Sequence, residues 1–229
     1  VAAALLMEQG YDVVGVTMRL WSAPGCEEEN RCCTPQTREL AAQLAEQLGI
    51  PFHILDAQQA FRQAVVQRFL DGYSRGDTPN PCVYCNRYLK WDHLWQFAQS
   101  IGAEAIATGH YARLREGTDG TYELWKGVDA TKDQTYFLSL LTQQHLAHTL
   151  FPLGEYTKVD VRQIAHERQL PSADAPESQD LCFLGKRDYR DFLCEYAPHA
   201  VQPGEIVDRQ GKVLGSHNGL AFYTIGQRK

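Results

Sequence analysis

Residues 13–18, Val-Val-Gly-Val-Thr-Met, form an apolar, β-branched run from which the expected architecture can be built outward. Such a run predicts a buried β-strand. Thr34 and Pro35 then have the composition of a helix N-cap and first-turn pair, and Gly49 ends the helical stretch that follows them. Residues 52–55, Phe-His-Ile-Leu, predict the next strand. The chain therefore begins its core with a strand, a helix and a strand.

The same alternation continues on both sides of this unit. Residues 1–9 predict a helix that Gly10 terminates, residues 61–69 carry apolar side chains at helical spacing, and residues 105–108 predict a strand. Strands that alternate with helices of about 10 to 15 residues are typical of β-α-β units. We therefore expect an α/β fold with a parallel sheet and helices on both of its faces.

Two candidate ligand positions follow from this fold. Ligands of parallel sheets bind beyond the carboxyl ends of the strands. Met18 and the pair Gly109-His110 come directly after expected strands, so we expect them at that crevice. On sequence alone, Met18 could equally be a core residue and His110 an ordinary surface imidazole.

Composition and charge narrow the class of protein. The chain has 229 residues, a formal net charge of −6 and seven cysteines, an odd number that favours reduced thiols over a disulfide framework. No run is long enough to span a membrane and the first residues lack a basic signal-peptide region, so we expect a cytoplasmic protein with no membrane partner. Residues 1–60 hold eight acidic and three basic residues, so the rest of the chain is nearly neutral. The negative charge therefore argues only weakly against a nucleic-acid partner.

Residues 78–91, TPNPCVYCNRYLKW, carry the strongest chemical signal. Pro79 and Pro81 restrict the backbone, so the entry to the cysteines is expected to be a stiff loop. Cys82 and Cys85 have CxxC spacing, which allows a disulfide, a shared metal or a thiol of lowered pKa.

Asn86 is expected to cap the helix that follows, which would place Cys85 beside a helix N-terminus. The partial positive charge there favours a thiolate. Three interpretations of the CxxC pair stay open: a structural pair of cysteines, a structural zinc site and a reactive thiol site. The flanking prolines and the helix start favour the reactive thiols.

Two segments later in the chain have the pattern of short β-strands. A hairpin is expected at residues 111–126, and after Pro203-Gly204 two short alternating strands are expected at residues 205–207 and 212–216. We therefore expect one domain at residues 1–200, with a helical extension, and the start of a β-rich domain at residues 201–229.

Six motifs occur together: T-P-N-P-x-x-x-C-N at 78–86, ATGHYAR at 107–113, KDQTYFL at 132–138, FPLGEYTK at 151–158, SQDLCFLG at 178–185 and GLAFYTIGQRK at 219–229. Together they resemble the tRNA-uridine 2-thiouridylases, enzymes that replace an oxygen of the wobble uridine with sulfur. The resemblance implies a PP-loop ATP pyrophosphatase domain of the adenine nucleotide alpha hydrolase type, followed by a central β domain. It also implies a strand and phosphate-binding loop before Val1 and a β-barrel after Lys229.

The resemblance implies a reaction and its partners. ATP, with magnesium, adenylates the C2 oxygen of the wobble uridine, and sulfur from a cysteine persulfide replaces it, giving 2-thiouridine and AMP. The partners would be the anticodon stem-loop of tRNA and a sulfur donor such as a cysteine desulfurase. The target base must leave its stack to react.

The resemblance also assigns residues. It implies that Cys85 is the catalytic nucleophile and that Cys182 carries the persulfide, with a Cys85–Cys182 disulfide in one version of the mechanism. Many members of the family have Asp where this chain has Cys82, and a thiol cannot be assumed to replace that carboxylate. The other implied contacts are Met18 and Gly109 with ATP, Asn80, Pro81 and Cys82 with the target base, and His110, Lys132, Asp133 and Gln134 with tRNA.

Two alternatives of other classes remain. In the first, Cys82, Cys85 and Cys182 are ligands of an iron-sulfur cluster or zinc in an adenine-nucleotide protein. In the second, the chain is a nucleotide-binding module without enzymatic activity, which leaves the CxxC loop without a role. The other cysteines are expected to be small buried hydrophobic residues: Cys26, Cys32, Cys33 and Cys194.

Overall fold

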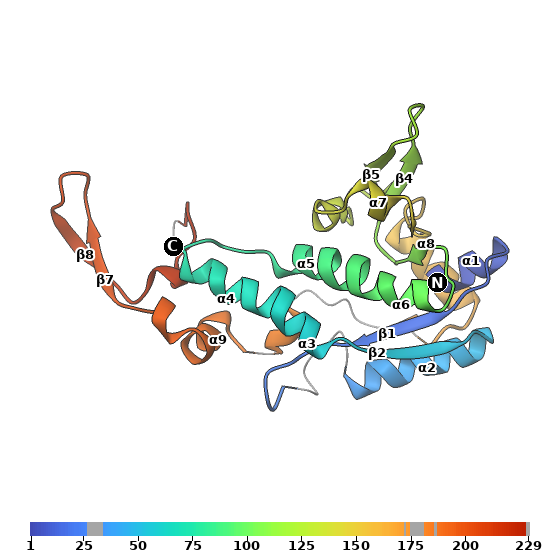
Figure 1. Ribbon diagram of the computed structural model, residues 1–229, viewed down its shortest axis with the longest axis horizontal. Coiled ribbons are helices and arrows are strands. Elements are labelled where there is room, and N and C mark those ends of the chain that lie inside the picture. Colours follow the sequence, from blue (N-terminus) through green and yellow to red (C-terminus); the bar gives the residue numbers. More distant parts are fainter. Residues whose placement is uncertain (27–33, 172, 175–180, 186, 228–229) are drawn as a thin grey trace.

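The computed structural model describes residues 1–26, 34–171, 173–174, 181–185 and 187–227 (Figure 1). Cys32, Cys33 and the first three residues of the SQDLCFLG motif lie outside the described residues. Within the described part of the chain, no helix is both long enough and apolar enough to span a membrane.

The expected strand-helix-strand unit is present. Strand β1 (Gly15–Arg19) pairs in parallel with β2 (Phe52–Asp56), with Gly15 opposite Phe52 and Arg19 opposite Asp56. Helix α2 (Pro35–Leu48) connects them. Thr34 caps this helix by accepting a 3.0 Å hydrogen bond from the N–H of Thr37, and Gly49 ends it with a left-handed φ of 68°.

A second parallel pair follows later in the chain. Strand β3 (Ile106–Ala107) pairs with β6 (Thr149–Leu150), and the N–H of Thr108 donates to the Leu150 carbonyl just beyond them. The strand expected at residues 105–108 is therefore present but shorter. Within the described residues, no ladder joins this pair to β1 and β2.

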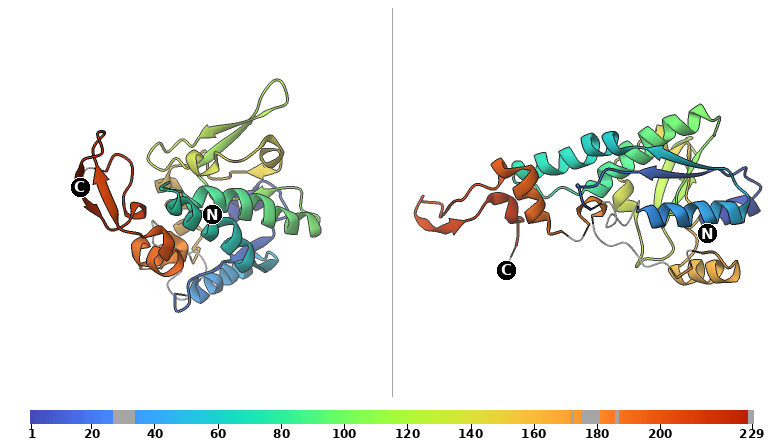
Figure 2. Two further views of the ribbon diagram at one scale, coloured as in Figure 1. Left: turned by 60° about the vertical axis from the view of Figure 1, so that its left-hand side comes forward. Right: turned by 90° about the horizontal axis from the view of Figure 1, so that it is seen from below.

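Two long helical runs lie side by side next to β1 and β2, and α2 lies on the opposite side of these strands (Figures 1 and 2). The first run comprises α3 (Gln58–Phe61), a π-helical segment η1 (Arg62–Val66) and α4 (Gln67–Ser74). The second comprises α5 (Pro81–Tyr84), a π-helical segment η2 (Cys85–His93) and α6 (Leu94–Ser100). This arrangement confirms the α/β class with helices on both faces of the parallel strands.

The main core lies between these runs and the C-terminal helices. Phe69 contacts Phe183 and Phe192 edge to face, at ring-centroid distances of 5.3 and 6.2 Å. Phe61, Phe69, Phe183 and Phe192 are all almost fully buried. Residues distant in sequence are therefore joined through one aromatic cluster.

The remaining elements cover the periphery. The two expected hairpins are present as β4 (Ala112–Glu116) with β5 (Tyr122–Lys126), and β7 (Gly204–Val207) with β8 (Val213–His217). The other helices are α1 (Ala2–Glu8), η3 (Thr135–Leu138), α7 (Gln143–Leu146), α8 (Lys158–Glu167), η4 (Cys182–Leu184), α9 (Tyr189–Tyr196), η5 (Pro198–Ala200) and η6 (Leu220–Phe222).

Candidate functional site

Cys82 and Cys85 lie in the first two turns of the helical run that starts at Pro81. Asn80 is the N-cap, and its side-chain oxygen accepts a 3.0 Å hydrogen bond from the backbone N–H of Cys82. Cys82 is exposed at the second helical position, whereas Cys85 is half-buried in the next turn. The two thiols therefore have different surroundings.

The expected helix cap at Asn86 is wrong. Asn86 lies buried inside η2, where its side-chain amide donates a 2.8 Å hydrogen bond to the carbonyl oxygen of Phe137. Pro81 explains the earlier start, because a proline at the first helical position has a suitable φ and needs no N–H acceptor. It is therefore Cys82, and not Cys85, that lies in the first turn, where a helix favours a thiolate.

The loop before the cysteines is held at two adjacent residues, Thr78 and Pro79. A Cβ atom on Gly72 of α4 would lie 2.8 Å from Cγ of Pro79, so only glycine allows this close approach. The hydroxyl of Thr78 donates to the hydroxyl of Thr224 at 3.3 Å, which links the loop to the GLAFYTIGQRK motif. The expectation of a fixed, presented loop fits this geometry.

Cys85, Cys182 and Met18 pack against the same buried cluster, although they lie far apart in sequence. Cys182 starts the short helix η4, and the next residue, Phe183, is buried among the core phenyl rings. Gly185 then turns the chain with φ 61° and ψ −123°, a conformation that favours glycine. Cys182 is therefore presented from a loop that is anchored in the core directly behind it.

The two expected ATP contacts occupy different positions. Met18 lies inside β1, opposite Leu55, so the expectation that it follows the strand end is wrong. The ladder extends to the Arg19–Asp56 pair, whose side chains lie 3.8 Å apart. Gly109 does follow β3, and it is exposed.

The same end of β2 borders a polar cavity of about 660 Å³. Its lining side chains are mostly neutral hydrogen-bonding groups. One of them, His93, has an Nε2 atom that is buried without a hydrogen-bond partner among the described residues. The lining residues are Asp56, Gln58, Gln59, Ala60, Gln63 and His93.

His110 is a buried residue, so it is not a surface imidazole. It is 8% exposed, contacts the rings of Trp91 and Phe151, and its Nδ1 atom lies 2.7 Å from the Thr108 hydroxyl. Burial, together with the nearby Lys90 ammonium, lowers the pKa of His110 to about 3. The imidazole is therefore neutral near neutral pH.

The segment Lys132-Asp133-Gln134 is fixed to the chain that follows His110. The Gln134 side chain accepts a 3.0 Å hydrogen bond from the N–H of Tyr111, and the Gln134 N–H donates to the Tyr111 carbonyl. Asp133 accepts a 2.8 Å hydrogen bond from Thr135 at Oδ2. Its Oδ1 atom is buried and, among the described residues, has no hydrogen-bond partner. Such an acceptor is costly unless a ligand supplies a donor.

Arg87 of η2 is engaged within the protein. Its guanidinium forms an ion pair with Asp92, and Asp92 also lies 3.3 Å from Nε2 of His145. Burial, followed by the Arg87 charge, lowers the pKa of His145 against the opposing effect of Asp92. This network joins the CxxC helix to α7.

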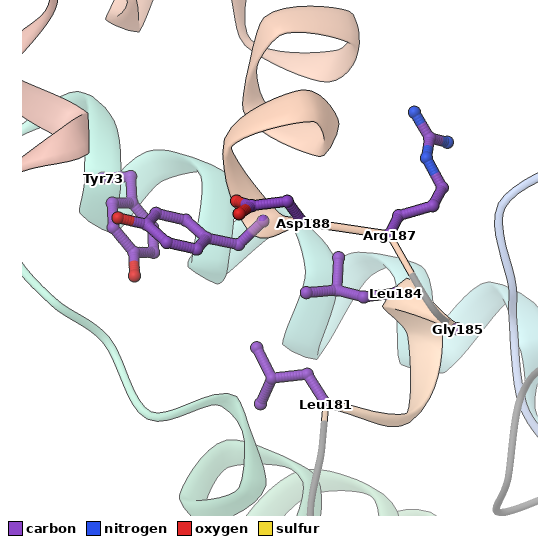
Figure 3. A pocket seen from close by; sticks show the side chains of 7 residues that line it. Tyr73, Leu181, Leu184, Gly185, Arg187 and Asp188 are labelled. Atoms are coloured by element: carbon purple, nitrogen blue, oxygen red, sulfur yellow. The ribbon is translucent and has the colours of Figure 1, made fainter.

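A cavity of about 360 Å³ lies between residues of the η4 segment and the start of α9 (Figure 3). Leu181 and Leu184 flank it on one side, and the rings of Tyr73 and Tyr189 stack at 5.3 Å on the other. Burial and the neighbouring Tyr189 raise the pKa of Tyr73, so its phenol stays protonated at neutral pH. The Arg187 side chain extends away from the rings in Figure 3. The cavity offers apolar and aromatic surface with phenolic hydrogen-bonding groups.

The described residues do not supply the ligand group that the alternative cluster or zinc site requires. Among them, no three His, Cys, Asp or Glu side chains are grouped closely enough to hold a metal ion. Cys82, Cys85 and Cys182 are all described, so the three thiols do not form a ligand set in this structure. Of the remaining cysteines, Cys26 is buried as expected and Cys194 is exposed, which corrects that expectation.

Comparison with protein families gives a match along almost the whole chain. The family described as tRNA methyl transferase HUP domain matches residues 1–186. The chain belongs to this family. The companion tRNA methyl transferase PRC-barrel domain matches residues 190–229. The HUP match agrees with the expected nucleotide-hydrolase type of α/β domain, whereas the expected boundary at residue 200 stays a prediction.

Curated relatives of this HUP-domain chain share one name, tRNA-specific 2-thiouridylase MnmA. The Carboxydothermus hydrogenoformans protein is 50% identical over 234 residues and the Clostridium perfringens protein 47% over 231, each covering 100% of this chain. The Magnetococcus marinus protein is 49% identical over 229 residues, covering 99% of this chain. The chain spans 64% of the length of these relatives.

Several features of the HUP-domain site had no clear signal in the sequence. The Arg87–Asp92 pair has a spacing of five residues, which brings two side chains together only because η2 is π-helical. The Tyr73–Tyr189 stack joins residues 116 positions apart and depends on how α4 and α9 pack. Asp133 was singled out by family resemblance, but its buried, unsatisfied oxygen is visible only in three dimensions.

Proposed function

We propose that this chain carries the catalytic part of an ATP-dependent tRNA-uridine 2-sulfurtransferase. It would convert the wobble uridine of tRNA to 2-thiouridine, with AMP and pyrophosphate as the other products of the ATP used. The names of relatives that are 47 to 50% identical support this activity. The sulfur donor, for example a cysteine desulfurase, and the anticodon stem-loop would be its partners. A cytoplasmic location stays a prediction.

One structural observation carries the proposal: Cys85 and Cys182 pack against the same buried cluster from two separate segments. One thiol comes from a helix and the other from a loop anchored by Phe183. Sulfur exchange between them would take place beside this shared cluster. We assign Cys182 as the persulfide carrier and Cys85 as the nucleophile.

Sulfur can reach C2 of the uridine by two routes. ATP first adenylates the C2 oxygen, and pyrophosphate leaves. In one route, the Cys85 thiolate attacks the Cys182 sulfur, a Cys85–Cys182 disulfide forms, and the released sulfide displaces AMP at C2. In the other, the terminal persulfide sulfur attacks C2 and displaces AMP, and the Cys85 thiolate then attacks the Cys182 sulfur, which forms the disulfide and releases 2-thiouridine. Both routes leave a disulfide, which an external thiol must reduce before the next turnover.

Several side chains would position the substrates. Asn80, Pro81 and Cys82 would contact the target base, and Asn80 and Pro81 also fix the helix start. The buried acceptor oxygen of Asp133 supports a role in binding an RNA donor group. The residues proposed to contact tRNA are His110, Lys132, Asp133 and Gln134, and those proposed to contact ATP are Met18 and Gly109.

The cavity lined by Leu181, Leu184 and the two tyrosines supports entry of a flat ring. Its apolar wall of Leu181 and Leu184 and its stacked tyrosines are surfaces on which an unstacked base can lie. A pocket that is already lined by such groups can accept a reacting base with little rearrangement of the protein.

The test is sulfur transfer by the complete gene product. Labelled cysteine, a cysteine desulfurase, ATP and a transcript of a tRNA with a wobble uridine are combined, and labelled 2-thiouridine and AMP are measured. We expect the two products in equal amounts. Absence of thiolation under these conditions would refute the proposal, and iron or zinc in stoichiometric amounts after anaerobic purification would favour the metal-binding alternative.

A further inference from the structure

Arg68 of α4 lies against two tyrosines of the CxxC helix. Its guanidinium carbon is 4.6 Å from the ring centroid of Tyr88 and 5.7 Å from that of Tyr84. The two rings are themselves stacked, at 6.5 Å with an interplanar angle of 21°. The planar guanidinium is therefore held in place by two aromatic side chains from the neighbouring helical run.

These tyrosines flank Cys85. Tyr84 precedes it, and Tyr88 lies one helical turn after Tyr84 on the same side of the run. Tyr84, Cys85 and Tyr88 all pack partly buried against the main core cluster. Arg68 thus lies over the helical turn that presents the proposed nucleophile.

Arg68 differs from Arg87, the other arginine near this turn, in whether a carboxylate pairs with it. Arg87, 5.3 Å from the Tyr88 ring, forms an ion pair with Asp92. Arg68 is exposed, and within the described residues no carboxylate pairs with it. Its positive charge is therefore not neutralised locally, although the chain as a whole carries a net charge of −6.

A guanidinium of this kind suits a phosphate. Its fork of donors matches two phosphate oxygens, and stacking on aromatic rings orients it before binding, so less side-chain entropy is lost. A stacked, exposed arginine can also serve only to hold two helices together. The absence of a carboxylate partner among the described residues favours the first role.

We propose that Arg68, oriented by Tyr84 and Tyr88, binds a backbone phosphate of the RNA strand whose target base reaches Cys85. This inference rests on the proposed function, because it takes tRNA as the ligand. A phosphate contact at this point would place the strand beside the proposed nucleophile without reading its sequence.

The test measures binding of a tRNA transcript with a wobble uridine to the complete gene product across a range of salt concentrations. Arg68→Gln should weaken binding about tenfold at low salt, the loss of one charge-assisted contact. It should also lower the magnitude of the log–log salt slope by about 0.7 to 0.9. Arg68→Lys should keep most of the slope, since the charge remains.

Arg62→Gln is the matched control. Arg62 is also exposed, lies on the same helical run and stacks over an aromatic ring, that of Trp21, at 5.8 Å. We expect its salt slope to equal that of the wild type. An unchanged slope for Arg68→Gln, or equal losses in both variants, would overturn the Arg68 proposal while thiolation by the wild type leaves the proposed function standing. A wild type that neither binds nor thiolates tRNA would overturn both.

Discussion

The side-chain amide of Asn86 donates a 2.8 Å hydrogen bond to the carbonyl oxygen of Phe137, and this bond ties the CxxC helix to the KDQTYFL segment. Asn86 is 4% exposed, so its partner would be left without a donor if the amide were removed. Two segments proposed to meet the same RNA are therefore held together by a buried polar contact.

Asn86→Ala should lower the free energy of unfolding by about 1–3 kcal/mol, because the Phe137 carbonyl loses its donor in a buried setting. Gln143→Ala provides the control, since the Gln143 side chain donates a 2.8 Å bond to the Tyr122 carbonyl and accepts a 2.7 Å bond from the Tyr122 N–H, both in an exposed position. The control should change stability by less than about 0.5 kcal/mol. Equal losses of unfolding free energy in the two variants, measured by urea denaturation, would show that burial does not make the Asn86 bond more stabilising.

Gly72→Ala tests the docking of the loop before the cysteines. Alanine would gain about 1 kcal/mol of helix propensity, but its Cβ would lie 2.8 Å from Cγ of Pro79, and overpacking of this kind costs about 1–3 kcal/mol. We therefore expect a net loss of stability and of thiolation. Pro79→Ala in the same chain should restore part of the stability loss.

Gly215→Ala is the control for this substitution. A Cβ at Gly215 meets no atom within 4 Å, so stability and thiolation should stay at wild-type levels. If Gly72→Ala proved as stable as Gly215→Ala, the loop would not be fixed by its contact with α4.

More of the architecture than of the site could be predicted from the sequence. The Thr34 cap, Gly49 and the hairpins at residues 111–126 and 205–216 have local signals, and the structure contains each of them. Asn86 shows the limit of local reasoning. It has the chemistry of a cap, but Asn80 and Pro81 form a stronger start, and tertiary contact with Phe137 gives Asn86 another partner.

His110 shows a second limit. Its position after β3 could be predicted, but its environment depends on Trp91 and Phe151, which approach from other segments. Sequence spacing contains no information on that burial. The convergence of Cys85 and Cys182 on one cluster is likewise a property of packing, and only the family resemblance paired the two residues beforehand.

The low pKa of His110 predicts a dependence of stability on pH. Its folded pKa of about 3 lies below the unfolded value of 6.5, so the unfolded state takes up a proton first as pH falls. Its contribution to stability is complete above pH 6.5 and is lost toward pH 3, at up to about 1.4 kcal/mol per pH unit. His110→Gln should reduce the slope of unfolding free energy against pH, measured by denaturation at pH 7.5, 6.0 and 5.0. A slope identical to that of the wild type would mean that His110 is not buried as a neutral group.

Lys132→Ala should weaken tRNA binding and lower the magnitude of the salt slope by about 0.7 to 0.9, because one phosphate contact is lost. Affinity for ATP should not change. Lys126→Ala is a useful comparison, since Lys126 lies at the end of β5 and outside the proposed RNA-contacting segment. A salt slope that is the same for Lys132→Ala and the wild type would identify Lys132 as a solvated surface residue.

Substitution of the three cysteines separates their roles. Cys182→Ser should abolish loading of labelled sulfur on the protein, since serine cannot form a persulfide. Cys85→Ser should leave a protein that loads sulfur but does not thiolate tRNA. Cys82→Ser should retain substantial activity, because Cys82 is exposed in the first helical turn and is proposed to assist at the target base.

The pattern across the three variants distinguishes a persulfide relay from a metal cluster. In a relay, loading and transfer are lost separately, at Cys182 and at Cys85. With a cluster, all three substitutions should lose iron and activity together, because each thiolate is a ligand. Cys194→Ser, at an exposed cysteine of α9, controls for the removal of a thiol as such. Full thiolation by Cys85→Ser or by Cys182→Ser would contradict both mechanisms, because neither route moves sulfur to the base without both residues.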